Sequence, residues 1–244
     1  MNQFDFAIVH FINGFAHRSR NFDTLVSLIE GSNLLKGGIG LALIWWAWFR
    51  YNQPSSDKRE FLLFGIVSSA FALLFGRALS LVLPFRERPW QNVPYHFQVP
   101  YSVTGGVHSW NSIPSDHAVL FFCLASSLWM VSRRLGVLAM CHALFVVCLP
   151  RLYVGYHFPT DILAGAALGI GAGLLSKFTW LRKSIARPAL RWVEIHPASF
   201  YAVAFLWTFE VGELFESLLT FQSFARSWLG ILPRIHNLFS DLTT

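Results

Sequence analysis

The stretch PRLYVGYHFPTDILAG, residues 150–165, connects two long apolar runs at 135–152 and 158–176 through a short turn. A helix that crosses a membrane needs about 20 mostly apolar residues, and both runs approach that length. The same stretch carries an arginine, a histidine and an aspartate. Three polar residues gathered in so short a turn between two apolar runs suggest a functional site. The sequence therefore predicts a helical membrane protein with a polar site between two spans.

The composition of the whole chain agrees with this class. Of the 244 residues, 54% are hydrophobic and 13% are charged, and the mean hydropathy is +0.47. Soluble domains carry about a quarter charged residues. Further apolar runs lie at 33–49, 61–84 and 117–132, which gives five predicted spans. A sixth near 198–220 is doubtful, because three glutamates share one face of it: Glu210, Glu213 and Glu216.

The expected fold is an all-α transmembrane bundle of five or six spans. Residues 1–32 predict an interfacial segment with an amphipathic helix and a turn, residues 33–191 the transmembrane core, and residues 192–244 a C-terminal helical segment. No cleavable signal peptide is expected at the start of the chain. The three cysteines lie inside apolar runs, which argues against disulfides and against a thiolate metal site.

The positive charges orient the bundle. Ten of the 19 Lys and Arg residues fall on one side of the predicted spans, at positions 50, 58, 59, 133, 134, 177, 182, 183, 187 and 191. Such an excess marks the cytoplasmic side. These charges lie between apolar runs and form no basic patch, so no nucleic acid partner is expected. The loop 85–116 and the turn 152–158 then share the opposite side, which is periplasmic or extracellular.

Three arginines form the first polar cluster on that opposite side. Arg77 lies inside the second span, and Arg86 and Arg88 follow its end. The simplest interpretation of Arg86 and Arg88 is anchoring at the membrane interface. Arg77 favours a function, because a charged residue within a span is costly. Together the three guanidiniums would suit phosphate oxygens.

The second cluster begins the third span. Ser115 is expected to cap the helix, whose exposed N–H groups attract anions. His117 would then lie in the first turn above the same anion. A capped helix with an interfacial histidine is the alternative.

The third cluster is Arg151, His157 and Asp161, within the opening stretch. Asp161 would accept a hydrogen bond from one imidazole nitrogen and leave the other free as a nucleophile or base. Histidine and aspartate also bind zinc, but the arginines favour an anionic substrate over a metal ion. A structural salt bridge between Arg151 and Asp161 is a further alternative.

Together the clusters supply the parts of a phosphoryl-transfer site. Arginines and a helix N-terminus would hold the phosphate oxygens, where electrostatics supplies most of the catalysis. One histidine would attack phosphorus and a second would protonate the leaving oxygen.

At these residues the sequence resembles the type 2 phosphatidic acid phosphatase family, whose fold is shared with the vanadium haloperoxidases. The family's third motif is Ser-Arg, five residues, His, three residues, Asp. It matches here at Arg151, His157 and Asp161, with Pro150 in place of the serine. The resemblance covers roughly residues 60–175.

The other two motifs match with changes. Pro-Ser-Gly-His reads Pro114-Ser115-Asp116-His117, so only the backbone N–H of Asp116 would serve a phosphate, with its carboxylate turned away. The Arg-Pro of the first motif is Arg88-Pro89. The lysine expected seven residues before the arginine falls on Leu81, and either Arg77 or Arg86 takes its place.

The resemblance implies roles for these residues. His157 would be the nucleophile, Asp161 its orienting partner and His117 the general acid. Phosphate would be bound by Arg88, Arg151, Ser115 and Asp116, together with Arg77 or Arg86. No metal or other cofactor is expected. Three glycines spaced four apart in the fifth span, Gly165, Gly169 and Gly173, are expected to allow close helix packing.

The leading hypothesis is an integral membrane phosphatase in the bacterial cytoplasmic membrane, acting on a lipid phosphate from the bilayer. Candidate substrates are undecaprenyl diphosphate, phosphatidylglycerol phosphate and phosphatidic acid, and the reaction would pass through a phosphohistidine. The alternatives are a phosphotransferase with an acceptor other than water, and a non-catalytic anion transporter. The sequence does not indicate an oligomeric state.

Overall fold

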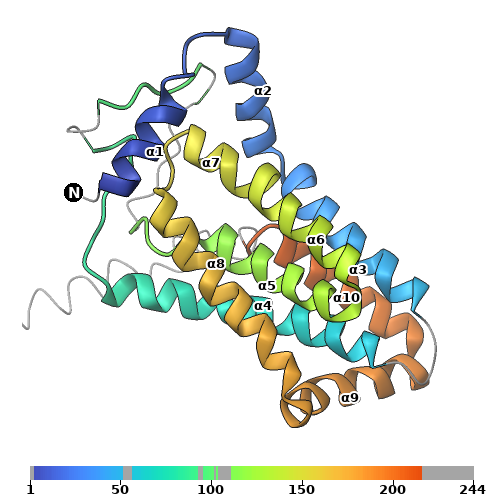
Figure 1. Cartoon of the computed structure of the whole chain (residues 1–244). Coiled ribbons are helices and arrows are strands. Elements are labelled where there is room, and N and C mark those ends of the chain that lie inside the picture. Colours follow the sequence, from blue (N-terminus) through green and yellow to red (C-terminus); the bar gives the residue numbers. More distant parts are fainter. Residues whose placement is uncertain (1–2, 52–56, 93–95, 102, 104–110, 216–244) are drawn as a thin grey trace, which may run out of the picture.

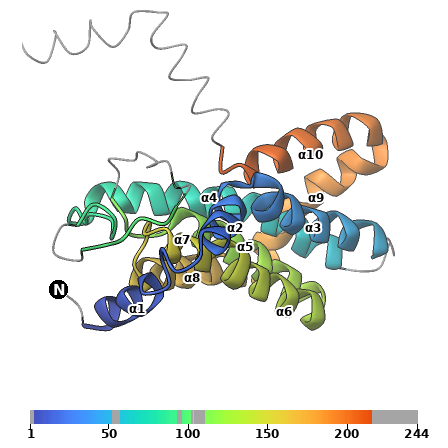
Figure 2. The same ribbon diagram turned by 90° about the horizontal axis from the view of Figure 1, so that it is seen from above.

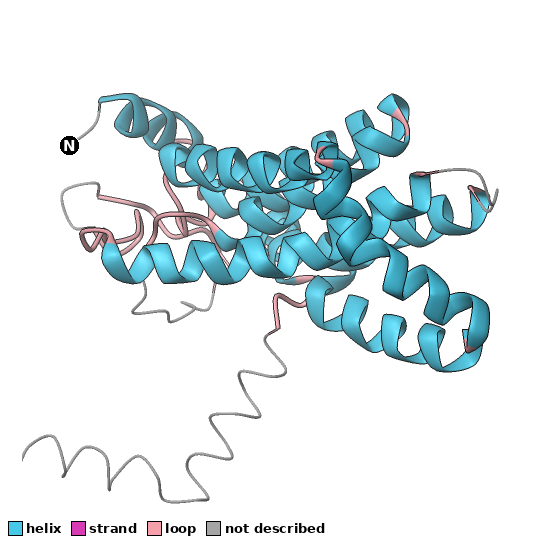
Figure 3. Cartoon of the chain, turned by 90° about the horizontal axis from the view of Figure 1, so that it is seen from below, coloured by secondary structure: helices cyan, strands magenta, loops and turns pink. Residues whose placement is uncertain are grey.

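The computed structural model describes residues 3–51, 57–92, 96–101, 103 and 111–215. Across these ranges the chain is helical and contains no strand (Figure 3), which confirms the all-α class. The elements are α1 (Gln3–Asn13), α2 (Arg20–Gly31), the π-helix η1 (Leu34–Gly38), α3 (Ile39–Arg50), α4 (Lys58–Val82), α5 (Asp116–Val131), α6 (Arg133–His142), the π-helix η3 (Ala143–Cys148), α7 (Leu149–Tyr153), α8 (Pro159–Leu174), the 3-10 turn η4 (Leu175–Lys177), α9 (Thr179–Ile195) and α10 (Pro197–Gly212).

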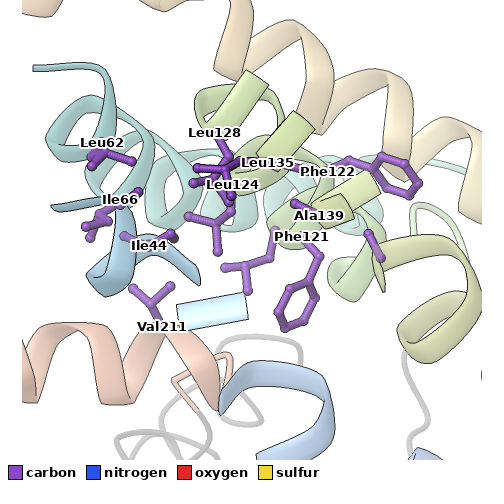
Figure 4. Packing of buried hydrophobic residues seen from close by; sticks show 14 of the residues in the cluster. Ile44, Leu62, Ile66, Phe121, Phe122, Leu124, Leu128, Leu135, Ala139 and Val211 are labelled. Atoms are coloured by element: carbon purple, nitrogen blue, oxygen red, sulfur yellow. The ribbon is translucent and has the colours of Figure 1, made fainter. Parts of the chain in front are cut away.

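Helix α5 lies at the centre of the bundle, packed against α4, α6 and α8 (Figure 1). Most of its side chains are buried, whereas Trp129 near its C-terminal end is 40% exposed. Figure 4 shows Leu124 and Leu128 of this helix beside Leu62 of α4 and Leu135 of α6. Helix α5 is therefore held by neighbouring helices along most of its length.

Three of the described helical stretches are long and apolar enough to cross a membrane: Lys58–Val82, Arg133–Tyr153 and Pro159–Lys177. They agree with the predicted spans 61–84, 135–152 and 158–176. Helix α5 is a shorter apolar helix, and the predicted span 33–49 corresponds to η1 followed by α3. The number of five or six crossings stays a prediction.

The C-terminal segment is described only in part. Helix α10 covers Pro197–Gly212 of the doubtful sixth span. Residues 216–244, including Glu216, lie outside the described residues.

Residues 3–31 form two helices where the sequence predicts one helix and a turn. Both helices contact α7 (Figure 2), and each buries an aspartate completely, Asp5 in α1 and Asp23 in α2. Asp23 accepts hydrogen bonds from the Tyr153 hydroxyl and from the backbone N–H groups of His17 and Tyr101. A buried carboxylate is costly unless it is hydrogen-bonded. These bonds therefore fasten the segment to the core.

The glycine stripe of α8 sets the distance to α5. A Cβ atom on Gly165 would lie 2.5 Å from the carbonyl oxygen of Ser115, and one on Gly169 would lie 2.3 Å from that of Val119. A Cβ on Gly173 would lie 2.6 Å from the Ser126 side chain. Only glycine permits such backbone contact, so the predicted close packing is confirmed.

Gly169→Ala should destabilise the protein, whereas Gly171→Ala on the same helix should not. A methyl group on Gly169 meets backbone, and overpacking of this kind costs about 1–3 kcal/mol. Nothing lies within 4 Å of a Cβ on Gly171, so alanine there should be neutral or stabilise by up to about 1 kcal/mol. Thermal unfolding of the purified variants in detergent measures both changes, and equal melting temperatures would contradict the assigned contact.

Candidate active site

The three polar clusters meet at one end of the bundle, where α7 ends and where α5 and α8 begin. The backbone N–H of Ser115 donates a hydrogen bond to the carbonyl oxygen of Asp161 over 3.1 Å. The Arg88 guanidinium donates through Nη1 to the carbonyl oxygen of Tyr156 over 2.8 Å. The first and second clusters are thus each hydrogen-bonded to the segment 150–165 that carries the third.

A tight turn between α7 and α8 presents His157. The backbone N–H of Tyr156 donates to the Arg151 carbonyl over 2.9 Å. Gly155 has φ +80, a conformation that favours glycine. A Cβ on Gly155 would also lie 2.6 Å from the Phe97 ring. The turn therefore needs a glycine two residues before His157.

A main-chain carbonyl holds the His157 imidazole. Nδ1 lies 2.9 Å from the carbonyl oxygen of Ser112. Because a carbonyl only accepts hydrogen bonds, Nδ1 carries the proton, and in the neutral ring Nε2 holds the lone pair of a nucleophile. Asp161, the predicted orienting partner, has Oδ2 3.9 Å from Nδ1, beyond hydrogen-bonding distance. The direct orienting bond therefore comes from Ser112, which the sequence did not indicate.

The surroundings of His157 keep it neutral. Burial holds the pKa of this imidazole well below its usual range, and the nearby guanidiniums of Arg151 and Arg88 act in the same direction. The ring is therefore neutral at neutral pH, with the lone pair on Nε2.

Asp161 holds the turn and binds Arg86. Its Oδ2 accepts from the backbone N–H of Phe158 over 2.7 Å, and its Oδ1 accepts from Nη1 of Arg86 over 2.7 Å. Arg86 also donates through Nη2 to Asp5 over 2.5 Å. Since Asp5 accepts from the Thr160 hydroxyl as well, over 2.6 Å, Arg86 joins α1 to the start of α8 and is held by protein carboxylates.

Arg77 is likewise paired within the protein. Its Nε donates to Oδ2 of Asp116 over 2.9 Å, and its Nη2 donates to the carbonyl oxygen of Leu214 over 3.0 Å. The Asp116 carboxylate thus faces Arg77. Neither of the two arginines considered in place of the motif lysine carries an uncompensated charge.

Arg88 and Arg151 are different, because each keeps an unused donor. The Nε atoms of both are buried and lack a hydrogen-bond partner among the described residues. Buried N–H groups are nearly always paired, and guanidinium donors fit phosphate oxygens closely. Burial lowers the pKa of Arg88, and the nearby positive charge of Arg151 lowers it further. The two side chains form the strongest anion-binding feature of the site.

Ser115 also has an unused group. It occupies the N-cap position of α5, but its side chain makes no capping hydrogen bond, so the expected cap is wrong. Its hydroxyl is buried and lacks a partner within the described part of the chain.

His117 faces Arg151. Its Nε2 lies 3.1 Å from Nη1 of Arg151. A guanidinium only donates, so Nε2 accepts in this arrangement. A general-acid role for His117 therefore requires that Arg151 release it and that a proton be taken up.

Two charged residues near the N-terminus also reach the site, and sequence reasoning missed both. Oε1 of Glu30 accepts from Nη1 of Arg151 over 2.7 Å and lies 3.9 Å from Nζ of Lys36. Arg151 therefore pairs with Glu30, and the alternative pairing with Asp161 is wrong. The sequence could have indicated Lys36, because it is a charged residue inside the predicted span 33–49. The same feature indicated a function for Arg77.

Comparison with known proteins gives one family. The sequence model of the PAP2 superfamily matches residues 61–184, which include Arg88, His117, Arg151 and His157. Glu30 and Lys36 lie outside the matched segment. No solved structure matches the chain significantly.

Three bacterial relatives are similar at modest identity. The bacitracin transport permease protein BcrC of Bacillus licheniformis is 26% identical over 145 residues, which are 58% of this chain and 63% of that protein. The undecaprenyl-diphosphatase BcrC of Bacillus subtilis (strain 168) is 22% identical over 171 residues, 70% of this chain and 81% of the relative. The lipid A 1-diphosphate synthase of Escherichia coli (strain K12) is 26% identical over 178 residues, 70% of this chain and 73% of the relative.

Asp5→Asn tests the connection between α1 and the site. The substitution removes a completely buried charge that faces Arg86, so we expect a loss of about 1–3 kcal/mol in the free energy of unfolding. Asp57→Asn is the matched control, because the Asp57 side chain is 60% exposed in its pair with Arg182 and exposed pairs contribute about 0–1 kcal/mol. Melting temperatures in detergent measure both, and an equal decrease in the two variants would contradict the assignment.

Proposed function

The chain belongs to the PAP2 superfamily, and from this premise we propose that it is an integral membrane phosphatase that hydrolyses a lipid phosphate or diphosphate. A polyprenyl diphosphate is the preferred substrate, because one relative is named an undecaprenyl-diphosphatase. Phosphatidylglycerol phosphate and phosphatidic acid are the other candidates. Residues 33–191 form the catalytic core, with 1–32 and 192–244 as flanking segments. The site faces the periplasm or exterior of a bacterial cytoplasmic membrane, since the excess of Lys and Arg lies on the other side.

The pair of unused guanidinium donors carries this proposal. Arg88 and Arg151 each keep a buried Nε without a partner in the described structure, beside a histidine whose Nε2 holds a lone pair. Charge-assisted hydrogen bonds to phosphate oxygens would satisfy both donors. The Ser115 hydroxyl and the first N–H groups of α5 add neutral donors to the same anion.

The first chemical step follows from this arrangement. Nε2 of His157 attacks phosphorus, a P–N bond forms, and the bond from phosphorus to the bridging oxygen breaks. His117, which Arg151 has released and which has taken up a proton from solvent when the anionic substrate binds, gives this proton to the departing oxygen of the lipid product. The Nδ1 proton stays in its bond to Ser112, and the Asp161 carboxylate near the ring stabilises the positive charge of the phosphorylated imidazole.

The second step reverses the roles. His117, now neutral, takes a proton from water as the water attacks the phosphohistidine. The P–N bond breaks, inorganic phosphate leaves, and His157 returns to its neutral form. Arg88 and Arg151 hold the equatorial oxygens in both steps, where charge stabilisation supplies most of the rate.

A phosphotransferase is the second candidate, because one relative is named a lipid A 1-diphosphate synthase. The same phosphohistidine would then pass its phosphoryl group to a lipid phosphate instead of water. Supplying a lipid monophosphate acceptor separates the two reactions, since a transferase forms a new diphosphate while a hydrolase releases phosphate regardless of acceptor.

Substitutions of the two histidines should separate their roles. His157→Ala removes the nucleophile, so phosphate release should fall to background on every substrate. His117→Ala keeps the nucleophile and should lower the rate about 10²–10⁴-fold on a lipid diphosphate. The loss should shrink for an activated aryl phosphate, whose leaving group needs no proton. The rate of phosphate release by Asp161→Asn should lie between the rates of these two variants. Phosphate release from both substrates is the measurement.

Two results would overturn these roles. Substantial activity of His157→Ala on either substrate excludes the phosphohistidine. If His117→Ala loses the same factor in rate on the lipid diphosphate and on the aryl phosphate, His117 is not the general acid. A non-catalytic transporter, the class suggested by the name of the Bacillus licheniformis relative, would release no phosphate in any variant.

Phosphatase activity should survive treatment with a chelator. Arg88, Arg151 and Lys36 place positive charge around the site and would repel a divalent cation, whereas they attract phosphate. Phosphate release is compared before and after EDTA, and orthovanadate should inhibit as a pentacoordinate mimic of phosphorus. Loss of activity that magnesium or zinc restores would refute the metal-independent mechanism.

A further inference from the structure

Lys36 is a buried lysine in the π-helix η1, at the start of the helical stretch that continues into α3. Its side chain is 9% exposed, and its Nζ lies 3.9 Å from Oε1 of Glu30. Taking an ammonium group out of water costs several kcal/mol, so a buried lysine is expected to have a role.

The carboxylate near Lys36 is shared with the catalytic residues. The same Oε1 of Glu30 accepts from Arg151 over 2.7 Å, and Arg151 lies 3.1 Å from Nε2 of His117. Lys36 is also among the positive charges that interact electrostatically with His117. One carboxylate of the protein thus lies between two cations, beside His117.

The two arginines considered in place of the motif lysine lie closer to protein carboxylates than Lys36 lies to Glu30. Arg77 pairs with Asp116, and Arg86 pairs with Asp5 and Asp161. Leu81, which occupies the position of the motif lysine, is apolar and 77% exposed. Lys36 comes from a different helix but approaches the same cluster.

Backbone contacts fix the turn that carries Lys36. A Cβ on Gly37 would lie 2.3 Å from the Gly212 carbonyl oxygen, so the end of α10 packs directly on η1. The Leu35 carbonyl lies 2.8 Å from Nε2 of His142, beside η3. Short π-helical turns often occur at functional sites. The backbone on both sides of Lys36 is therefore held in place by α10 and by His142.

We propose that Lys36 binds the phosphate group at this site and supplies the positive charge that the missing motif lysine would provide. The inference rests on the proposed function, because it adds a residue to the same site. Glu30 is a positioning residue, whose carboxylate holds Lys36 and Arg151 until a phosphate oxygen replaces it.

Orthophosphate binding tests the proposal without catalysis. Isothermal titration of the purified full chain in detergent with inorganic phosphate gives the dissociation constant. Lys36→Met keeps the length and removes the charge, and we expect binding to weaken roughly 10- to 100-fold, as for loss of one charged hydrogen bond. Lys36→Arg should retain binding within about threefold, since a guanidinium also binds phosphate oxygens.

Two further variants control for charge and for folding. Lys177→Met makes the same change at an exposed lysine following α8, and should leave the dissociation constant unchanged. Glu30→Gln removes the competing carboxylate, so phosphate should bind at least as tightly as to the wild type. If Lys36→Met does not fold, the double variant Glu30→Gln/Lys36→Met avoids an unbalanced buried carboxylate and should still bind phosphate at least tenfold more weakly than Glu30→Gln.

The outcomes separate this inference from the proposed function. If the wild type hydrolyses a lipid diphosphate and Lys36→Met binds phosphate as tightly as the wild type does, the inference alone is wrong. If Glu30→Gln binds phosphate more weakly, the competition between Glu30 and phosphate is wrong. If the wild type releases no phosphate but Lys36→Met weakens binding, the inference holds and the proposed function is wrong.

Discussion

Backbone contact between α5 and α8 is the constraint on which the site depends. Both histidine-bearing segments lie at the starts of these helices, and Gly165 and Gly169 let the two backbones touch. The hydrogen bond from Ser115 to the Asp161 carbonyl then sets the two starts at one level. Because α5 is enclosed by α4, α6 and α8, this register cannot shift without disturbing the core.

Unused hydrogen-bond donors divide the arginines of this region into two groups. Arg77 and Arg86 are held by protein carboxylates within 3 Å, so they hold helices together. Arg88 and Arg151 each keep a buried Nε without a partner among the described residues, even though Arg151 also pairs with Glu30. A buried donor of this kind is nearly always satisfied, so these two side chains can still bind an anionic ligand. The unused donors therefore distinguish binding arginines from structural ones, which residue type alone does not.

Local pattern predicted the all-α fold and the residues that the structure brings together in the candidate site. Long apolar runs gave the helices, glycine spacing gave the α5–α8 contact, and motif spacing brought His117, His157 and Arg151 together. The partners Asp5 and Glu30 were missed because they come from α1 and α2, far away in sequence. A local sequence pattern does not predict which distant carboxylate will pair with a given arginine. It also does not predict a hydrogen bond to a backbone carbonyl such as that of Ser112.

The bond from His157 to Ser112 has a genetic consequence. The acceptor is a main-chain oxygen, so every codon at position 112 encodes it, and an alanine scan would pass over the group that orients the imidazole. The backbone N–H of the same residue donates to the Arg86 carbonyl over 3.1 Å. The position of the acceptor is thus inherited through the path of the chain, which the neighbouring Asn111 side chain also holds, and a substitution at position 112 leaves the acceptor oxygen itself in place.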